Sequence, residues 1–148
     1  MKGIYALILL LTPERYIVVG KLGKLLFRAG YYVYVGSAFS GIERLNRHVI
    51  NFRRGNVDKP HWHIDYIAPY SKLMEYIFIP CPSRNKEGEL ANVIAKYLSY
   101  TPGFGSSDTN APSHLFFSIS LKEIKENLEK SFNMLDLNPI QVKDFKDK

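Results

Sequence analysis

The sequence predicts an α/β (α+β) fold, in which a small, mainly antiparallel sheet is flanked by helices. The run Ile4–Leu11 is almost continuously apolar, as expected of a central strand that is covered on both faces. Three more β-prone runs follow before residue 37, so the first 36 residues are predicted to form a meander of antiparallel strands. After residue 40 the apolar residues recur at intervals of three and four, which is the period of an amphipathic helix.

The remaining strands of the first half are predicted where β-branched and aromatic residues gather, at Tyr16–Val19, Leu25–Arg28 and Tyr31–Val35. Ser40-Gly41 can start the helix, and Gly55 fits its end. One face of this helix is an apolar stripe made of Ile42, Leu45, Val49 and Phe52. The polar residues predicted to lie off that stripe are Arg44, Arg47, His48 and Arg54.

The second half alternates between the two periods. Strands are predicted at Leu73–Ile79 and His114–Ile119, and a helix at Glu87–Leu98. Ser120 begins a last helix, and Glu123 at the third position completes a capping box. We expect a single domain over residues 1–135 and a charged tail over residues 136–148.

The composition limits the class of protein. With 148 residues, 46% apolar and 23% charged, the chain is neither disordered, nor collagen-like, nor a coiled coil. Its one cysteine, Cys81, excludes an internal disulfide and a cysteine-based zinc cluster. The net charge of +6 favours polyanionic partners such as nucleic acid. Ile4–Leu11 is too short to span a bilayer and no signal-peptide cleavage site follows it, so we expect a cytoplasmic protein without a membrane partner.

Several polar motifs converge on the predicted strand ends beside the basic helix. Gly3-Ile4-Tyr5 opens the first strand, and Tyr34-Val35-Gly36 closes the fourth. Arg44 lies eight residues after Gly36, and His48 lies one helical turn further on. In this order the motifs resemble the GIY-YIG nuclease superfamily. The likeness is greatest to a branch of archaeal and bacterial GIY-YIG-like domains that are sometimes fused to endonuclease III.

The resemblance covers about residues 3–119. It includes the runs Lys59–Tyr66, Glu87–Ala91 and Gly103–Asp108, followed by Ser113-His114-Leu115. One departure is that 28 residues lie between Tyr5 and Tyr34, so a hairpin is predicted to be inserted around Gly20–Gly30.

The resemblance implies a metal-dependent nuclease that hydrolyses phosphodiester bonds in DNA, with a link to DNA repair and to a repair-protein partner. The implied catalytic residues are Tyr5, Tyr34, Arg44, His48 and Glu89. Tyr5 would activate or orient the attacking water, with a pKa lowered by the helix that carries Arg44 and His48. Arg44 would clamp the phosphate with two hydrogen bonds, and His48 would polarise the water or contact phosphate.

Glu89 is expected to hold one divalent cation, Mg²⁺ or Mn²⁺, because these hard ions suit carboxylate and phosphate oxygens. Glu89 is chosen over Glu87 because it directly precedes Leu90-Ala91 at the helix start. The basic residues expected to extend the phosphate track are Arg47, Arg53, Arg54 and Lys59.

A second group of polar residues lies in the aromatic segment Lys59–Tyr70, which is either a helical turn or extended. If it is extended, His61, His63 and Asp65 share one face and resemble a two-histidine, one-carboxylate metal site. If it is helical, only His61 and Asp65 align. Because the motif is short and contains Trp62, structural hydrogen bonding is the favoured interpretation for either conformation.

The later loop holds Ser107, Asp108 and His114, whose neighbourhood can line the site or bind phosphate. No nucleophile elbow surrounds these residues, so a hydrolase triad is not expected. Three alternatives therefore stay open: a non-catalytic nucleic-acid-binding module of the same fold, a metal-dependent enzyme acting through His61, His63 and Asp65, and a protein-interaction subunit.

Overall fold

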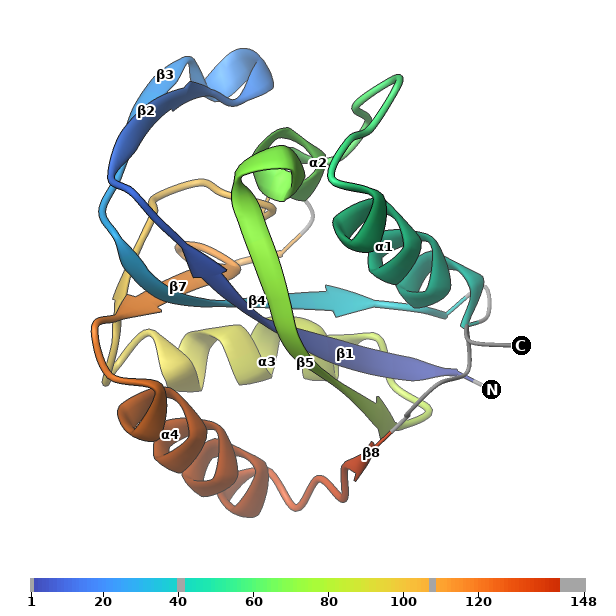
Figure 1. The fold of residues 1–148 in the computed structure, drawn as a ribbon. Coiled ribbons are helices and arrows are strands. Elements are labelled where there is room, and N and C mark those ends of the chain that lie inside the picture. The colour runs from blue at the N-terminus through green and yellow to red at the C-terminus, as the bar shows by residue number, and fades with distance from the viewer. Residues whose placement is uncertain (1, 40–41, 107–108, 142–148) are drawn as a thin grey trace.

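The structure, a computed structural model, describes residues 2–39, 42–106 and 109–141. A six-stranded sheet has the order β6-β7-β4-β1-β5-β8, and all its neighbouring strands are antiparallel (Figure 1). The predicted fold class is therefore confirmed. The strands are β1 (Gly3–Leu11), β2 (Arg15–Val18), β3 (Lys24–Phe27), β4 (Gly30–Ser37), β5 (Ser71–Pro80), β6 (Ser99–Tyr100), β7 (Leu115–Ser118) and β8 (Ile140–Gln141). The helices are α1 (Glu43–Arg54), α2 (His63–Ile67), α3 (Asn85–Ile94) and α4 (Leu121–Met134), with single 3₁₀ turns at Gly20–Leu22 and Ala68–Tyr70.

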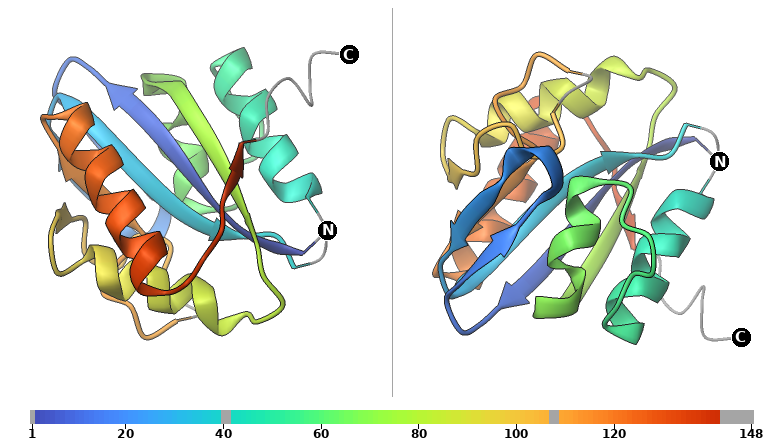
Figure 2. Two further views of the ribbon diagram at one scale, coloured as in Figure 1. Left: turned by 90° about the horizontal axis from the view of Figure 1, so that it is seen from below. Right: turned by 90° about the horizontal axis from the view of Figure 1, so that it is seen from above.

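The strand β1 lies at the centre of the sheet, between β4 and β5, as its apolar run predicts. Helices α1 and α2 cover one face of the sheet, and α3 and α4 cover the other (Figures 1 and 2). Alternate residues of β1 therefore enter two separate cores. Tyr5 and Leu7 pack toward α1, whereas Ile4 and Ala6 pack toward α3 and α4.

Helix α1 positions most of the basic residues. It buries Leu45, Val49 and Phe52 against the sheet and ends at Gly55, which adopts the left-handed conformation, with a φ of 77°. The predicted stripe and helix end are confirmed. His48 was expected to lie off the stripe, but it is 1% exposed because α2 packs over that side of the helix.

The strands β2 and β3 form a separate two-stranded sheet, so the predicted four-stranded meander is wrong. The β1–β4 ladder ends where Leu11 pairs with Gly30, so residues 12–29 lie beyond that ladder. The inserted hairpin therefore spans Arg15–Phe27 rather than the expected Gly20–Gly30. It packs Phe27 edge-to-face on Phe104, at 6.4 Å between ring centroids.

The second half differs from the prediction mainly at element ends. Helix α3 ends at Ile94 instead of Leu98, and the short strand β6 follows. Ser120 caps α4 by accepting a hydrogen bond from the Glu123 N–H, as predicted, but the Glu123 carboxylate bonds the Ser118 hydroxyl instead of closing the capping box.

The fold continues past residue 135, where the domain was expected to end. Leu137 is buried and β8 pairs with β5, so the sheet extends to Gln141. Over the residues that the structure describes, no helix is both long and apolar enough to cross a bilayer.

Candidate functional site

A polar cavity of about 150 Å³ opens beside the first turn of α1. The sheet contributes the tyrosines and the end of β4, and the segment before α2 contributes an aromatic wall. The residues that line it are Tyr5, Tyr34, Gly36, Ser37, Arg44, His61, Trp62, His63, Glu87, Gly105 and Thr109. Three of the five predicted catalytic residues, Tyr5, Tyr34 and Arg44, thus meet at one place, from β1, β4 and α1.

The two tyrosines come from neighbouring strands. Tyr5 pairs with Gly36 across the ladder, and the rings of Tyr5 and Tyr34 lie 6.5 Å apart between centroids. The Tyr5 ring occupies the space above Gly36, where a Cβ would approach ring atom Cε1 to 2.6 Å. A glycine is therefore required at this position by close packing, since the backbone itself is ordinary strand.

Arg44 lines the cavity and is held in place by two neighbours. Its Nη1 donates to the Ser37 carbonyl at 3.4 Å, and its guanidinium lies 4.9 Å from the centroid of the Trp62 ring. Arg47, which follows Arg44 by about one helical turn, lies 5.6 Å from the centroid of the same ring. The indole thus orders two guanidinium groups by cation–π attraction, while the Arg44 N–H groups that do not contact Ser37 can still bind an anion.

His48 lies behind the tyrosines and is not among the residues that line the cavity. Its ring centroid is 5.8 Å from that of Tyr5 and 6.4 Å from that of Tyr34. Burial lowers the pKa of His48 to about 4, against the opposing influence of Asp65. The imidazole is therefore neutral at pH 7, and its buried Nε2 has no hydrogen-bond partner among the described residues.

Glu87, not Glu89, is the carboxylate that lines the cavity. Its Oε2 lies 3.3 Å from Nδ1 of His114. Glu89 pairs with Lys86 at 3.1 Å, and its side chain is 48% exposed. Residues two positions apart on a helix point to nearly opposite sides, so only one of the two glutamates can face the sheet end. The prediction of Glu89 is corrected accordingly.

The buried His114 contacts the carboxylate of Glu87. Its Nδ1 lies 2.9 Å from the Val35 carbonyl and faces the Glu87 carboxylate, and both are acceptors. Nδ1 therefore carries the proton, and Nε2 accepts from the Thr109 hydroxyl at 2.9 Å. His114 belongs to this site rather than to a second one. Ser107 and Asp108, which were grouped with it, lie outside the described residues.

The proposed three-residue metal site in the aromatic segment does not form. The segment is helical from His63, so His61, His63 and Asp65 do not share a face. The side chains of His63 and Asp65 are also occupied, since His63 Nδ1 accepts from the Gly105 N–H at 2.7 Å and Asp65 accepts from the N–H groups of His61 and Trp62. Within the described ranges, no group of three or more His, Cys, Asp or Glu side chains is arranged to hold a metal ion.

The expected lowering of the Tyr5 pKa is also wrong. Burial raises the pKa of Tyr5 well above its usual value, and the nearby Arg44 offsets only part of that increase. Burial raises the pKa of Tyr34 in the same way. Because His48 is neutral, it supplies no positive charge to either phenol. Both tyrosines therefore keep their hydroxyl protons at neutral pH.

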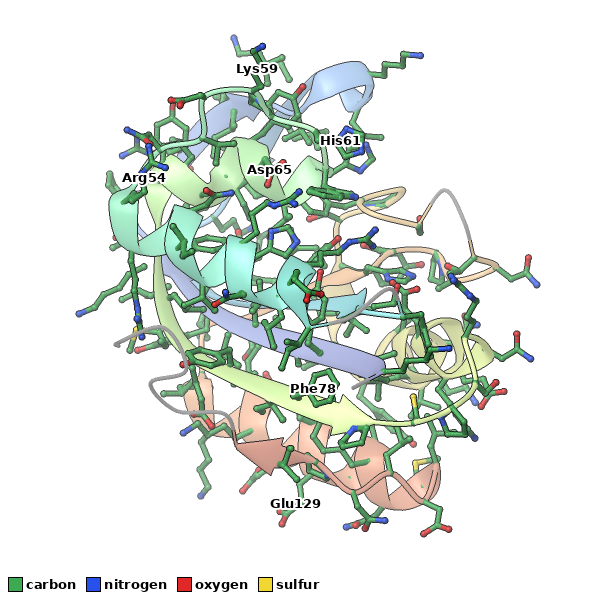
Figure 3. The ribbon with its side chains drawn as sticks, turned by 90° about the vertical axis from the view of Figure 1, so that its right-hand side faces the viewer. Arg54, Lys59, His61, Asp65, Phe78 and Glu129 are labelled. Carbon is green, nitrogen blue, oxygen red and sulfur yellow. The ribbon has the colours of Figure 1, made fainter. Side chains whose placement is uncertain are left out.

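The residues predicted to extend the phosphate track are all exposed but do not form one cluster. Arg47 faces Trp62 beside the cavity. Arg53 and Arg54 lie in the last turn of α1, and Lys59 lies in the loop that follows. Figure 3 shows Arg54 and Lys59 on the same side of the molecule as His61, and far from Glu129 on α4.

The cavity offers one carboxylate to a cation and no all-protein metal cage among the described residues. Glu87 is half-buried, lines the cavity and is the one acidic side chain among its lining residues. Mg²⁺ is commonly bound by one or two carboxylates together with water and substrate phosphate. Glu87 is therefore the residue that could hold such an ion, and Arg44 could bind a phosphate beside it.

Sequence reasoning missed Trp62 and Thr109 as well as Glu87. Trp62 is the single tryptophan of the chain and stands between two histidines, which is a signal that could have been used. Nothing in the local sequence marks Thr109, because its role depends on His114.

Comparisons with known proteins identify a family without an activity. A family model described as "Domain of unknown function DUF123" matches residues 4–137. A search of curated proteins and a search of solved structures each found no match.

Proposed function

The chain belongs to the DUF123 family, whose description names no activity, and we propose from the site that it is a metal-dependent nuclease that hydrolyses phosphodiester bonds, with DNA as its substrate. One observation carries the proposal. A carboxylate, a guanidinium and two phenols from four different elements line a single cavity, in an arrangement that suits phosphoryl chemistry. The resemblance of these motifs to GIY-YIG nucleases supports the same proposal, as does the net charge of +6.

Arg44 is the phosphate ligand in this proposal. Its guanidinium can offer two parallel donors to the phosphoryl oxygens and neutralise the charge that builds up on them. Trp62 and the Ser37 carbonyl hold the side chain in place before substrate arrives, so little conformational entropy is lost on binding.

Tyr5 orients the attacking water or a phosphoryl oxygen through its hydroxyl, because its raised pKa keeps the proton on the phenol. His48, neutral and with a free Nε2, is a proton acceptor beside both tyrosine rings. Glu87 would hold the divalent cation, Mg²⁺ or Mn²⁺, which when bound supplies charge for the phosphoryl and leaving oxygens. A cytoplasmic location and a DNA-repair partner remain part of the proposal.

The direct test is cleavage of labelled plasmid, branched DNA and single-stranded RNA with Mg²⁺, with Mn²⁺ and with chelator. Arg44→Ala should reduce the rate by about 100-fold or more, the loss typical when one charge-stabilising donor is removed. Lys122→Ala removes an exposed positive charge from α4, on the opposite face of the sheet (Figure 1), and should change the rate by less than about threefold. A cleavage rate that is unchanged by chelator and by Arg44→Ala would contradict the proposal. Salt-sensitive binding without cleavage would favour a non-catalytic binding module.

A further inference from the structure

The inserted hairpin has one face in the core and one face in solvent. Ile17 and Phe27 are buried, whereas Tyr16 is 62% exposed and Val18 is 60% exposed. Tyr16 pairs with Leu26 across the two strands, and Val18 pairs with Lys24. The outer face therefore presents a phenol, two aliphatic side chains and an ammonium group, with no described segment packed over it.

A groove of about 390 Å³ runs beside this hairpin. Its walls are β2 on one side and the segment from Val57 to Tyr70 on the other. Three of its lining side chains are tyrosines, Tyr16, Tyr66 and Tyr70, and two are prolines, Pro60 and Pro69. Aromatic rings with solvent-exposed faces are the surfaces on which unpaired nucleobases stack.

Cations sit directly on two of these rings. The Lys24 ammonium lies 5.2 Å from the centroid of Tyr16, and the Arg15 guanidinium lies 4.8 Å from that of Tyr70. Residues 14–28 and 53–59, which adjoin the groove in the sequence, contain seven lysines or arginines and two acidic residues, Glu14 and Asp58. The groove lining itself includes one acidic residue, Asp65, which is 3% exposed and accepts the N–H groups of His61 and Trp62. This excess of positive charge around the groove favours a polyanionic ligand.

The groove and the catalytic cavity share one wall. His61, Trp62 and His63 line the cavity. From the same segment, the groove is lined by Pro60, Asp65, Tyr66, Pro69 and Tyr70. Helix α2, which lies between the two, has five residues and is therefore roughly 8 Å long. One nucleic-acid strand can cross that distance within a few nucleotides.

We propose that this groove binds unpaired nucleobases of the strand whose phosphate enters the cavity, by stacking on Tyr16, while Lys24 and Arg15 contact the neighbouring phosphates. This inference rests on the proposed function for its class of ligand, and it narrows the substrate to nucleic acid with a single-stranded segment. Tyr16 is the main platform, because it is 62% exposed whereas Tyr70 is 41% exposed.

The test is equilibrium binding by fluorescence anisotropy, with chelator present so that no strand is cut. The probes are a labelled oligothymidylate and a labelled duplex of similar charge. Tyr16→Ala should weaken binding of the single strand by about 5- to 150-fold, which corresponds to one stacked base. It should change duplex binding by less than about twofold, and Tyr16→Phe should retain wild-type affinity for both probes.

The control is Tyr100→Ala, which removes a 39% exposed tyrosine from β6, outside the groove, and should change neither affinity. Unchanged single-strand binding in Tyr16→Ala, or an equal loss on both probes, overturns the groove. A cleavage assay of the same preparations separates the two proposals. If the wild-type protein does not cut DNA but Tyr16→Ala loses single-strand binding, the groove proposal is supported and the nuclease proposal is contradicted. If the protein cuts DNA but Tyr16→Ala binds the single strand as tightly as wild type, the nuclease proposal is supported and the groove proposal is contradicted.

Discussion

The carboxylate of Asp65 lies 3.8 Å from Nδ1 of His48, and both side chains are almost fully buried, at 4% and 1% exposure. The other Asp65 oxygen accepts the N–H groups of His61 and Trp62, at 2.8 and 2.9 Å. One carboxylate therefore fixes the start of α2 and faces an imidazole from α1. Its charge favours the tautomer with the proton on Nδ1, which leaves Nε2 free on the side away from Asp65.

Asp65→Asn should reverse the tautomer of His48. The amide oxygen can still accept from the α2 backbone, but the amide N–H₂ then faces His48 and needs an acceptor there. We expect Nδ1 to lose its proton to Nε2, and stability to fall by about 1–3 kcal/mol. Imidazole ¹⁵N chemical shifts report the tautomer, and urea unfolding reports the stability. Asp58→Asn, an exposed match, should change neither, and an unaltered tautomer in Asp65→Asn would refute this role.

Acid should destabilise the protein partly through His48. Its pKa falls from 6.5 to about 4 on folding, so between these pH values the unfolded chain binds more protons than the folded one. The free energy of unfolding must therefore fall as the pH drops from about 6.5 to about 4. The lowered pKa of His63 acts in the same direction.

His48→Gln removes the larger of these two contributions. Urea unfolding at a series of pH values should show a shallower loss of stability for His48→Gln than for wild type across this window. Parallel curves for the two proteins would mean that His48 does not resist protonation in the folded state.

Gly36→Ala should displace Tyr5. The new methyl group would overlap the Tyr5 ring, so either the ring or β4 must shift, at a cost of about 1–3 kcal/mol. Thermal unfolding measures the cost. The same substitution in a Tyr5→Ala background should cost much less, because the ring that it meets is gone. An equal cost in both backgrounds would show that the ring does not require the glycine.

Local sequence predicted the elements whose patterns are strong. The uninterrupted apolar run gave the central position of β1, and the three-and-four spacing of Leu45, Val49 and Phe52 gave the buried face of α1. The motifs at the ends of β1 and β4 correctly placed Tyr5 and Tyr34 side by side, since antiparallel pairing brings those ends together.

The features that were missed depend on contacts between distant segments. Glu87 and Glu89 are equivalent in sequence, and only the packing of α3 against β4 decides which one faces the cavity. His48 was placed on the polar side of α1 because the later segment that buries it, with Trp62 and Asp65, cannot be read from the helix itself. The hairpin's separation from the sheet is likewise set by the pairing of Leu11 with Gly30.

The choice between the two glutamates also gives the most direct test of the nuclease proposal. Single-turnover cleavage of labelled DNA should be measured for wild type, Glu87→Gln and Glu89→Gln over a range of Mn²⁺ concentrations. We predict that Glu87→Gln cuts about 100-fold more slowly or needs far more metal, while Glu89→Gln stays within about threefold of wild type. Equal cutting by all three proteins, or loss of cutting only in Glu89→Gln, would contradict a catalytic site built on Glu87, Arg44 and the two tyrosines.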